Sequence, residues 1–463
     1  MNAPTILTDV SRRAFLQRSA LFGVAGVAAP FVTSLGAIGE AAAATASDYK
    51  ALVCIFLAGG NDHYNTLVPY DPTSHAKYAS LRSSLAFSRE ALAPTVLLPT
   101  ADLGGRAYAL APAMAPLSPL FDAGRMAVAM NVGTLIQPTT KAQYQNKSVR
   151  LPPKLFSHND QQSFFQASSP EGAGSGWGGR IGDLFQSGNG TAATTCINAS
   201  GNAVFLSGRN AIQYNVGTGG PVPLLRNASS LYGSTLAAQT LRQMMTETNP
   251  HMFGTEYARI NKRAMDTQAQ LANSLAGVPE SNFPLFPDEN GLADQLRMVA
   301  RMIAISGDLG TKRQVFFVSM GGFDLHDNLA GNQPRLLTKL SEAMRAFHDT
   351  TVALGVADKV TTFTGSDFGR TLPSNGNGCD HGWGSMHFVM GGAVKGKRLY
   401  GTAPLVGTNT TDDVGQGRLI PTMSVDQYAS TLARWFGVSD GDMSTVLPNI
   451  GNYDKSTWGQ GFV

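Results

Sequence analysis

The sequence predicts an α/β protein with a doubly wound, mostly parallel sheet and helices on both faces. Two observations lead to this prediction: short, continuously apolar runs end abruptly in glycine and polar residues, and amphipathic stretches lie between some of them. Apolar runs without alternation are typical of strands that are buried on both faces, as in a parallel sheet. Ligands of such sheets bind beyond the carboxyl ends of the strands, so the residues after each run are the first candidates for a site.

Four apolar runs are expected to form strands, over residues 52–57, 126–130, 315–318 and 360–363. Between the last two runs, apolar residues recur at helical spacing, at Leu336, Leu340, Met344 and Phe347. A strand, a helix and a second strand of this length form a βαβ unit. Two further helices are expected over residues 292–305 and 425–436.

The first residues have a different character from the rest of the chain. Arg12 and Arg13 precede a weakly apolar stretch, 20–38, and a run of small residues, 41–46. This order predicts a twin-arginine export signal over residues 1–46, followed by a single domain over 47–463. The alternative is a membrane anchor, which the Gly/Ala-rich composition and the cleavage-like run disfavour. We therefore expect a periplasmic or secreted protein that uses the twin-arginine translocase during export.

The composition excludes several classes of partner. The chain has 35 Lys and Arg against 32 Asp and Glu, so its charge is nearly balanced, and no basic patch indicates nucleic acid. After the signal, no segment is long and apolar enough to predict a transmembrane anchor. The three cysteines cannot all pair within one chain, so a disulfide framework is not expected.

Aspartates follow three of the four predicted strands closely. These residues are Asp62, Asp324 and Asp367. Carboxylates that converge at one edge of a sheet repel one another, and a divalent cation removes that cost. A single aspartate after a strand is otherwise an ordinary turn former or helix cap.

Histidines favour the metal hypothesis, because they crowd into the same glycine-rich loops. Of eight histidines, four lie there: His63, His326, His381 and His387. Asp380 stands beside His381 in the same loop. Mixed carboxylate and imidazole ligands suit zinc or manganese better than calcium, which prefers oxygen alone.

Other motifs add little. Residues 174–179 fit G-x-G-x-x-G, but no strand-like run precedes them, so a dinucleotide site is not expected. The sequence has no G-x-S-x-G elbow, H-E-x-x-H helix, Walker A loop or C-x-x-C pair. These absences weigh against a serine esterase, a zincin protease, a nucleoside triphosphatase and a thioredoxin-like enzyme.

Five motifs together resemble the secreted bacterial family known as domain of unknown function 1501. They occupy residues 56–70, 321–326, 366–371, 380–384 and 387–392, in the order that is typical of that family. The family is grouped with the alkaline phosphatase and sulfatase superfamily. The resemblance implies a doubly wound sheet, two metal positions and a nucleophile at the start of a helix.

The resemblance also implies roles for the candidate ligands. Asp62 is similar to the superfamily's first-strand ligand, and Asp324 with His326 to the Asp–His pair of one metal position. Asp367 is similar to the aspartate of an Asp-His element, but Phe368 stands where the superfamily has histidine. One or two ions are therefore expected. Ligands for a second ion would come from Asp380 with His381, and either His381 or His387 would be the late histidine.

The superfamily's nucleophile is a Ser, Thr or modified Cys between the first aspartate and the later ligands. Ser157 opens an apparent helix in this interval, where backbone N–H groups would favour its alkoxide. Ser157 is equally an ordinary N-cap, and Thr134 is the second candidate. His158 and Asp160 are alternative metal ligands.

Two arginines are candidate clamps for an anionic substrate. Arg370 and Arg180 would meet a phosphate or sulfate bidentately, although either is also readable as a structural arginine. The sequence thus predicts an exported, metal-dependent hydrolase of phosphoric or sulfuric esters, with a saccharide or an envelope polymer as the candidate carrier of the ester. The alternative is a non-catalytic member of the same fold that binds metal or an envelope polymer.

Overall fold

The computed structural model describes residues 48–225, 229–248 and 250–463, so the predicted export signal lies outside the described residues. Residues Tyr49–Val463 form one compact unit. Within the described ranges, no helix has the length and apolar character needed to cross a bilayer.

A ten-stranded sheet runs through the unit in the order β11-β4-β10-β9-β1-β8-β5-β6-β7, with β12 beside β4. Its strands are β1 (Lys50–Leu57), β4 (Met126–Gly133), β5 (Cys196–Asn198), β6 (Tyr214–Gly217), β7 (Gly220–Pro221), β8 (Arg313–Met320), β9 (Val360–Ser366), β10 (Ser385–Gly391), β11 (Leu399–Tyr400) and β12 (Met423–Ser424). A separate pair is formed by β2 (Leu67–Pro69) and β3 (Tyr108–Leu110).

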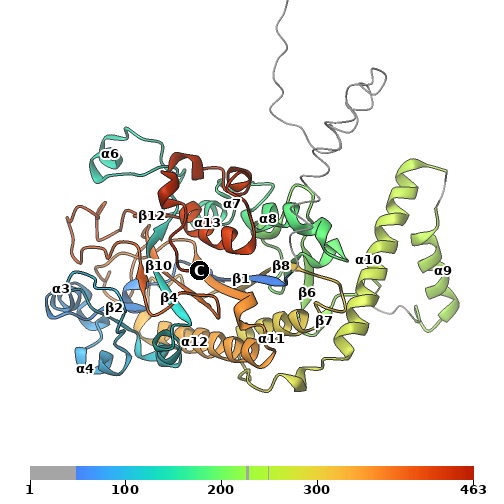
Figure 1. The fold of residues 1–463 in the computed structure, drawn as a ribbon, viewed down its shortest axis with the longest axis horizontal. Coiled ribbons are helices and arrows are strands. Elements are labelled where there is room, and N and C mark those ends of the chain that lie inside the picture. The colour runs from blue at the N-terminus through green and yellow to red at the C-terminus, as the bar shows by residue number, and fades with distance from the viewer. Residues whose placement is uncertain (1–47, 226–228, 249) are drawn as a thin grey trace, which may run out of the picture. The chain divides into compact units, whose positions relative to one another are not determined.

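The helices are α3 (Pro72–Arg82), α4 (Arg89–Leu92), α5 (Ser118–Asp122), α6 (Lys141–Asn146), α7 (His158–Ala167), α8 (Trp177–Phe185), α9 (Thr235–Thr246), α10 (Met252–Ala276), α11 (Gly291–Ala304), α12 (Leu329–Ala353), α13 (Val425–Phe436) and α14 (Met443–Val446). In Figure 1, α11 and α12 cover one face of the sheet, and α7, α8 and α13 cover the other. Two separate hydrophobic clusters fill these two layers. The predicted doubly wound α/β fold is therefore confirmed.

All four predicted strands form, as β1, β4, β8 and β9, and each is longer than its apolar run. The predicted helices correspond to α11, α12 and α13. Neighbours in the sheet pair in parallel, except where β10 runs antiparallel to β4 and β9, and where β7 runs antiparallel to β6. β10 was not predicted, and its residues were expected to form a loop.

The central strands bring three loops to one edge. β1 lies between β8 and β9, and its last residue, Leu57, is level with Met320 of β8 and Ser366 of β9. Since all three strands run in the same direction, the segments that follow them leave the sheet side by side. This register places the loop that carries Asp324 next to the segment that begins with Asp367.

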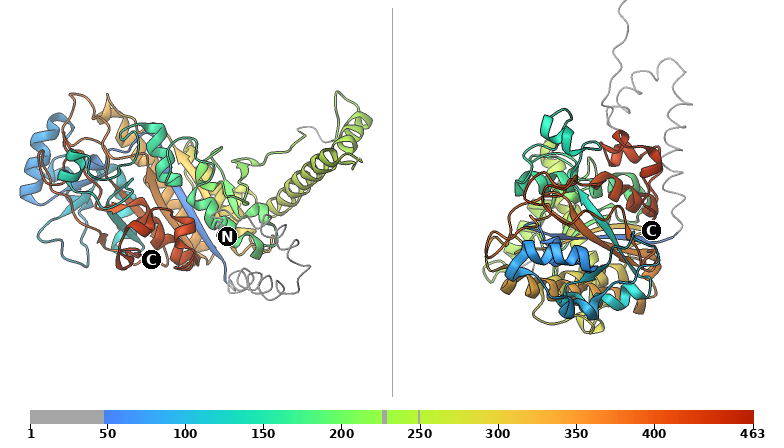
Figure 2. Two further views of the ribbon diagram at one scale, coloured as in Figure 1. Left: turned by 90° about the horizontal axis from the view of Figure 1, so that it is seen from above. Right: turned by 90° about the vertical axis from the view of Figure 1, so that its left-hand side faces the viewer.

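A helical hairpin made of α9 and α10 projects from the sheet-containing body, as Figures 1 and 2 show. Several large apolar side chains on it are exposed, among them Leu236, Met244, Met252 and Phe253. The hairpin lies away from the strand-end loops, so it does not contribute to the site described next.

Candidate metal centre

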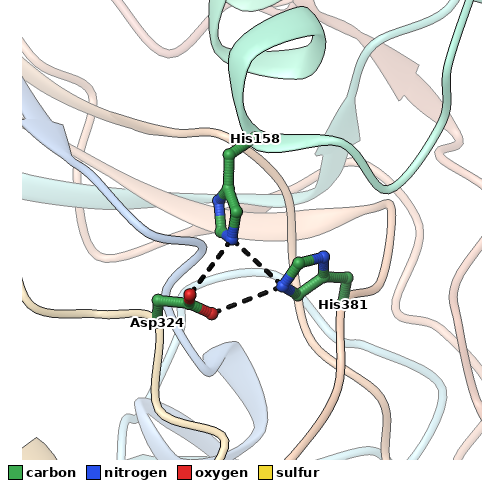
Figure 3. A group of neighbouring side chains, drawn as sticks. All are labelled: His158, Asp324 and His381. Carbon is green, nitrogen blue, oxygen red and sulfur yellow. Dashed lines mark hydrogen bonds and ion pairs between the residues drawn. The ribbon is translucent and has the colours of Figure 1, made fainter.

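Three side chains from three distant parts of the chain converge beyond the carboxyl ends of the central strands. They are His158 at the start of α7, Asp324 after β8 and His381 after β9 (Figure 3). One ligand atom from each lies within 4.8 Å of the other two. His158 Nε2 is 3.0 Å from His381 Nε2 and 3.3 Å from Asp324 Oδ2.

His326 adjoins this triad from the same loop as Asp324. Its Nε2 lies 2.9 Å from His381 Nε2 and 3.1 Å from Asp324 Oδ1. The side chains of His326 and Asp324 are 45% and 47% exposed, so one side of the centre faces solvent. The structure thus brings together three of the predicted ligands, Asp324, His326 and His381, and adds His158.

The other nitrogen of each histidine ring meets an acceptor. His158 Nδ1 lies 2.7 Å from a carboxylate oxygen of Asp367, and His326 Nδ1 lies 3.2 Å from Asp380 Oδ1. His381 Nδ1 lies 2.7 Å from the carbonyl oxygen of Phe156. A carbonyl oxygen only accepts, and carboxylates that are ionised do the same, so each Nδ1 is assigned the ring proton. Each Nε2 then points a lone pair at the centre.

Lone pairs at this spacing repel one another. A neutral His381 Nε2 faces two other unprotonated Nε2 atoms at 2.9 and 3.0 Å. A proton on one ring, or a cation between them, removes the repulsion. In a tetrahedral zinc site with bonds near 2.0–2.1 Å, ligand atoms lie about 3.3 Å apart. The donor set and its spacing therefore fit a divalent ion, which histidines with carboxylate-held Nδ1 atoms typically bind.

The surroundings act differently on the ionisation of the groups at the centre. A hydrogen bond to Asp367 raises the pKa of His158, which favours its protonated form when no cation is bound, whereas burial lowers the pKa of His381. Partial burial alone would raise the pKa of Asp324, but the hydrogen bond and charge of Arg370 outweigh it and lower that pKa. Asp324 is thus held as a carboxylate, and His381 as a neutral imidazole, which are the forms that bind metal.

Arg370 is completely buried and ties the strand-end loops together. It donates to the carbonyl oxygens of Gly59, Gly60, Phe323 and Cys379 and, at 2.5 Å, to Asp324 Oδ1. These acceptors occupy the guanidinium, so it does not offer the free bidentate face that the predicted substrate clamp requires. Arg370 is therefore a positioning residue, which holds the Asp324 carboxylate by a hydrogen bond.

Gly59 lets two of these loops touch. Its φ is +115°, and a Cβ atom there would lie 2.5 Å from the backbone nitrogen of Asp324. Its own N–H donates to the Asp367 carboxylate at 3.2 Å. Any larger residue would push Asp324 away from the centre.

Asp367 and Asp380, both predicted as ligands, lie behind the histidines, on the side away from the centre. Their carboxylates contact the outer nitrogens of His158 and His326 rather than the shared centre. Asp367 is also almost fully buried, with 3% of its side chain exposed, while 42% of Asp380 is exposed. In this geometry neither carboxylate faces the shared centre, and each holds the ring of a histidine that does.

Two other predicted ligands lie elsewhere. The buried carboxylate of Asp62 pairs with both terminal nitrogens of Arg82, at the end of α3. His387 lies inside β10 with its ring against Phe165 and Tyr428, and burial lowers its pKa to about 3. The prediction for His387 assumed a loop, whereas antiparallel β10 turns this side chain into the hydrophobic layer.

The candidate nucleophiles are engaged with neighbours. Ser157 precedes α7 as expected, but its hydroxyl donates to Asp160 at 2.9 Å and caps no backbone N–H. Asp160 also pairs with Lys154 at 3.5 Å and lies outside the histidine cluster. Thr134 is buried, with its hydroxyl on Gln161.

Arg180, the other candidate clamp, is buried and donates to the carbonyl oxygens of Ala167, Ser175 and Val446. Burial lowers its pKa to about 10. It therefore acts as a structural link rather than as a group that faces the centre.

His158 was named from the sequence only as an alternative ligand, because it stands beside Ser157 at the start of a predicted helix. No spacing rule relates it to Asp324, which lies far along the chain. Phe368, which stands where the superfamily has histidine, packs its ring 4.8 Å from that of His158 and 4.7 Å from that of His381. An aromatic wall at this position agrees with a single ion better than with two.

Comparisons with known proteins place the chain in a family without assigning an activity. No curated protein matches it. Among solved structures, the lipoteichoic acid synthase LtaP from Listeria monocytogenes is similar at 9% identity and a TM-score of 0.34, over 88% of this chain and 76% of that one. A mutant of the alkaline phosphatase PafA is similar at 12% identity and a TM-score of 0.26, over 70% and 64%.

A third neighbour comes from a Bacteroides thetaiotaomicron locus for the metabolism of multiple glycosaminoglycans, at 11% identity and a TM-score of 0.33, over 85% and 74%. These neighbours are of the kinds that the sequence resemblance implied, but likeness at this level says nothing about activity. The family model described as "Protein of unknown function (DUF1501)" matches residues 49–450. The chain therefore belongs to the DUF1501 family.

Proposed function

We propose that the protein is an exported, metal-dependent hydrolase of phosphoric or sulfuric esters that holds one divalent ion, zinc or manganese. One observation carries the proposal: three imidazole Nε2 atoms and the Asp324 carboxylate converge, while each Nδ1 is held by an acceptor. His158, Asp324, His326 and His381 would hold the ion. A ligand set of imidazole and carboxylate suits these metals.

A divalent ion supplies two things to ester hydrolysis, a Lewis acid for an ester oxygen and a water nucleophile at neutral pH. Side chains around the centre would orient and charge the ligands of such an ion. Asp367 and Asp380 fix the orientation of two imidazole rings, and Arg370 holds Asp324 charged. The exposed halves of Asp324 and His326 leave an open side for a substrate.

Water is favoured over serine as the nucleophile. The hydroxyl of Ser157 donates to Asp160, and the donors of Arg370 are taken by the protein. A covalent route would need both Ser157 and Asp160 to turn away from one another. We therefore propose hydrolysis without a phosphorylated or sulfated serine.

The second candidate function is a non-catalytic protein that binds metal or an envelope polymer. The same two observations favour it, since neither a free nucleophile nor a free arginine faces the centre. Turnover separates the two candidates, because only the hydrolase consumes an ester.

The test uses the purified mature protein. Elemental analysis should find about one zinc or manganese per chain, and aryl phosphate or aryl sulfate should be hydrolysed. His381→Ala should lose both, because His381 Nε2 contacts all three other ligand groups. Asp122→Asn, at an exposed position at the end of α5, is the matched control and should keep both. Full metal content in His381→Ala would refute the ligand assignment, and metal without turnover would leave the binding function.

A further inference from the structure

A polar cavity of about 380 Å³ lies beside α7. Its walls come from α7, the segment after it, the loop after β5, and the end of β8. The polar lining residues are Asn159, Gln162, Ser163, Gln166, Glu171, Ser200, Asn202 and Ser319. Amides and hydroxyls dominate, and Glu171 is the one charged side chain among the lining residues.

One face of α7 forms the amide wall. Asn159, Gln162 and Gln166 are spaced three and four residues apart, so they lie on the same side of the helix. Gln166 is 97% buried, and its Oε1 accepts from the Phe205 N–H at 3.2 Å. With Asn159 and Gln162, it gives this wall both hydrogen-bond donors and acceptors.

The same helix leads to the metal centre. His158 is its first residue, and Asn159 follows directly, so the two side chains start about 3.8 Å apart along the backbone. On the opposite wall, Ser319 stands near the end of β8, five residues before Asp324. The cavity and the centre therefore share two elements: α7 carries residues of both, and β8 leads from Ser319 to the loop of Asp324.

The charge of the lining restricts what the cavity takes. No lysine or arginine lines it, and the Glu171 carboxylate would repel a phosphate or sulfate. Side-chain amides and hydroxyls supply both donors and acceptors, which match the hydroxyls of a sugar. Apolar ligands would leave these groups unpaired.

We infer that this cavity is a subsite for a neutral saccharide, which holds the sugar of a substrate whose anionic ester group lies at the metal centre. The inference names the substrate class of the proposed hydrolase and rests on that function for the fate of the ester. Binding of the sugar itself needs no metal, because none of the lining residues belongs to the centre. This separation makes the two proposals testable independently.

Saturation-transfer difference NMR with the full mature protein tests the subsite. The probes are glucose, galactose, N-acetylglucosamine and maltose at millimolar concentration, and we expect at least one to bind. Gln162→Leu and Ser319→Ala should each weaken that binding about fivefold or more, since each removes a hydrogen-bonding group. Gln239→Leu, an exposed glutamine on α9, is the matched control and should bind as the unmodified protein does.

Asp324→Asn should keep the sugar signal while it loses metal. Failure of all four sugars to bind would overturn the subsite, as would unchanged binding in both cavity variants or displacement of the sugar by sulfate. If the unmodified protein binds sugar but holds no metal, the proposed hydrolase alone is refuted. Metal and turnover without sugar binding would refute the subsite alone.

Discussion

Two aspartates that both follow central strands have opposite surroundings. Asp62, after β1, is buried and its carboxylate meets the guanidinium of Arg82. Asp324, after β8, is half exposed and meets the Nε2 atoms of three histidines together with one nitrogen of Arg370. The first carboxylate is neutralised within the protein. The second carboxylate meets its guanidinium through Oδ1 alone, and its Oδ2 faces the imidazole of His158.

The comparison shows what turns a carboxylate after a strand into a candidate ligand. Position at the edge of the sheet is shared by both residues and does not separate them. The difference lies in the facing groups, because Arg82 pairs with both oxygens of Asp62, whereas Arg370 pairs with one oxygen of Asp324 and imidazoles face that carboxylate as well. Substitutions at Asp324 and at Asp62 are therefore expected to have different effects on metal binding and on stability.

The largest effect is expected at Asp324. Asp324→Asn should weaken metal binding by more than about a hundredfold, because it removes the charge at the centre of the ligand set. The amide oxygen still accepts from Arg370, so the metal-free protein should unfold at nearly the same temperature. Competition with a chromogenic chelator measures the first quantity, and calorimetry after chelation measures the second. Unchanged metal affinity would remove Asp324 from the site.

A large effect of another kind is expected at Asp62. Asp62→Asn should lower the free energy of unfolding by about 3–5 kcal/mol, because it leaves the Arg82 charge buried without a partner. Metal content per folded chain should not change. Denaturant unfolding with parallel elemental analysis measures both.

The control for Asp62 replaces the pair. Asp62→Leu with Arg82→Met removes both charges and should recover much of the lost stability. A stable Asp62→Asn protein that has lost its metal would reverse the comparison, since Asp62 would then be the ligand.

A smaller effect is expected where carboxylates support the histidines. Asp367→Asn and Asp380→Asn should each weaken metal binding about 10–100-fold, as loss of an outer hydrogen bond typically does. The loss should be greater for Asp367, which is buried, and whose carboxylate also accepts from the Gly59 N–H. Equal affinities in both variants and the unmodified protein would show that Nδ1 needs no acceptor.

The smallest effect is expected from a third aspartate, Asp426, which is buried in α13. Burial raises its pKa to about 6. The unfolded chain ionises it near pH 4, so its stabilising contribution is complete below pH 4 and is lost as pH rises through 6. Asp426→Asn should lack this loss, which corresponds to about 3 °C in melting temperature. Melting curves of both proteins between pH 4 and 7 measure the difference, and parallel curves would contradict it.

The sequence was sufficient for the parts of the fold that follow from local pattern. Continuous apolar runs marked β1, β4, β8 and β9, and helical spacing marked α12. β10 was missed because its residues lie in a stretch rich in Gly and Asn, and its pairing with β4 and β9 is a long-range property. The α9–α10 hairpin was missed for a similar reason, as its exposed apolar residues blur the amphipathic pattern.

The candidate site was predictable only in part. Asp324, His326 and His381 were named because they follow strands, and the structure brings them together. Sequence could not show that Arg82 claims Asp62, since the end of α3 approaches β1 only in the fold. It also could not rank His158 above Asp367, because which atom faces the centre depends on the rotation of α7.

X-ray absorption at the metal edge of the loaded protein tests the central claim most directly. The account predicts a coordination shell with about three imidazole nitrogens and carboxylate oxygen at about 2.0–2.1 Å for zinc. His326→Ala should lose one imidazole from that shell, while Asp62→Asn should leave it unchanged. A shell of oxygens without imidazole, or one that changes with Asp62, would contradict the account.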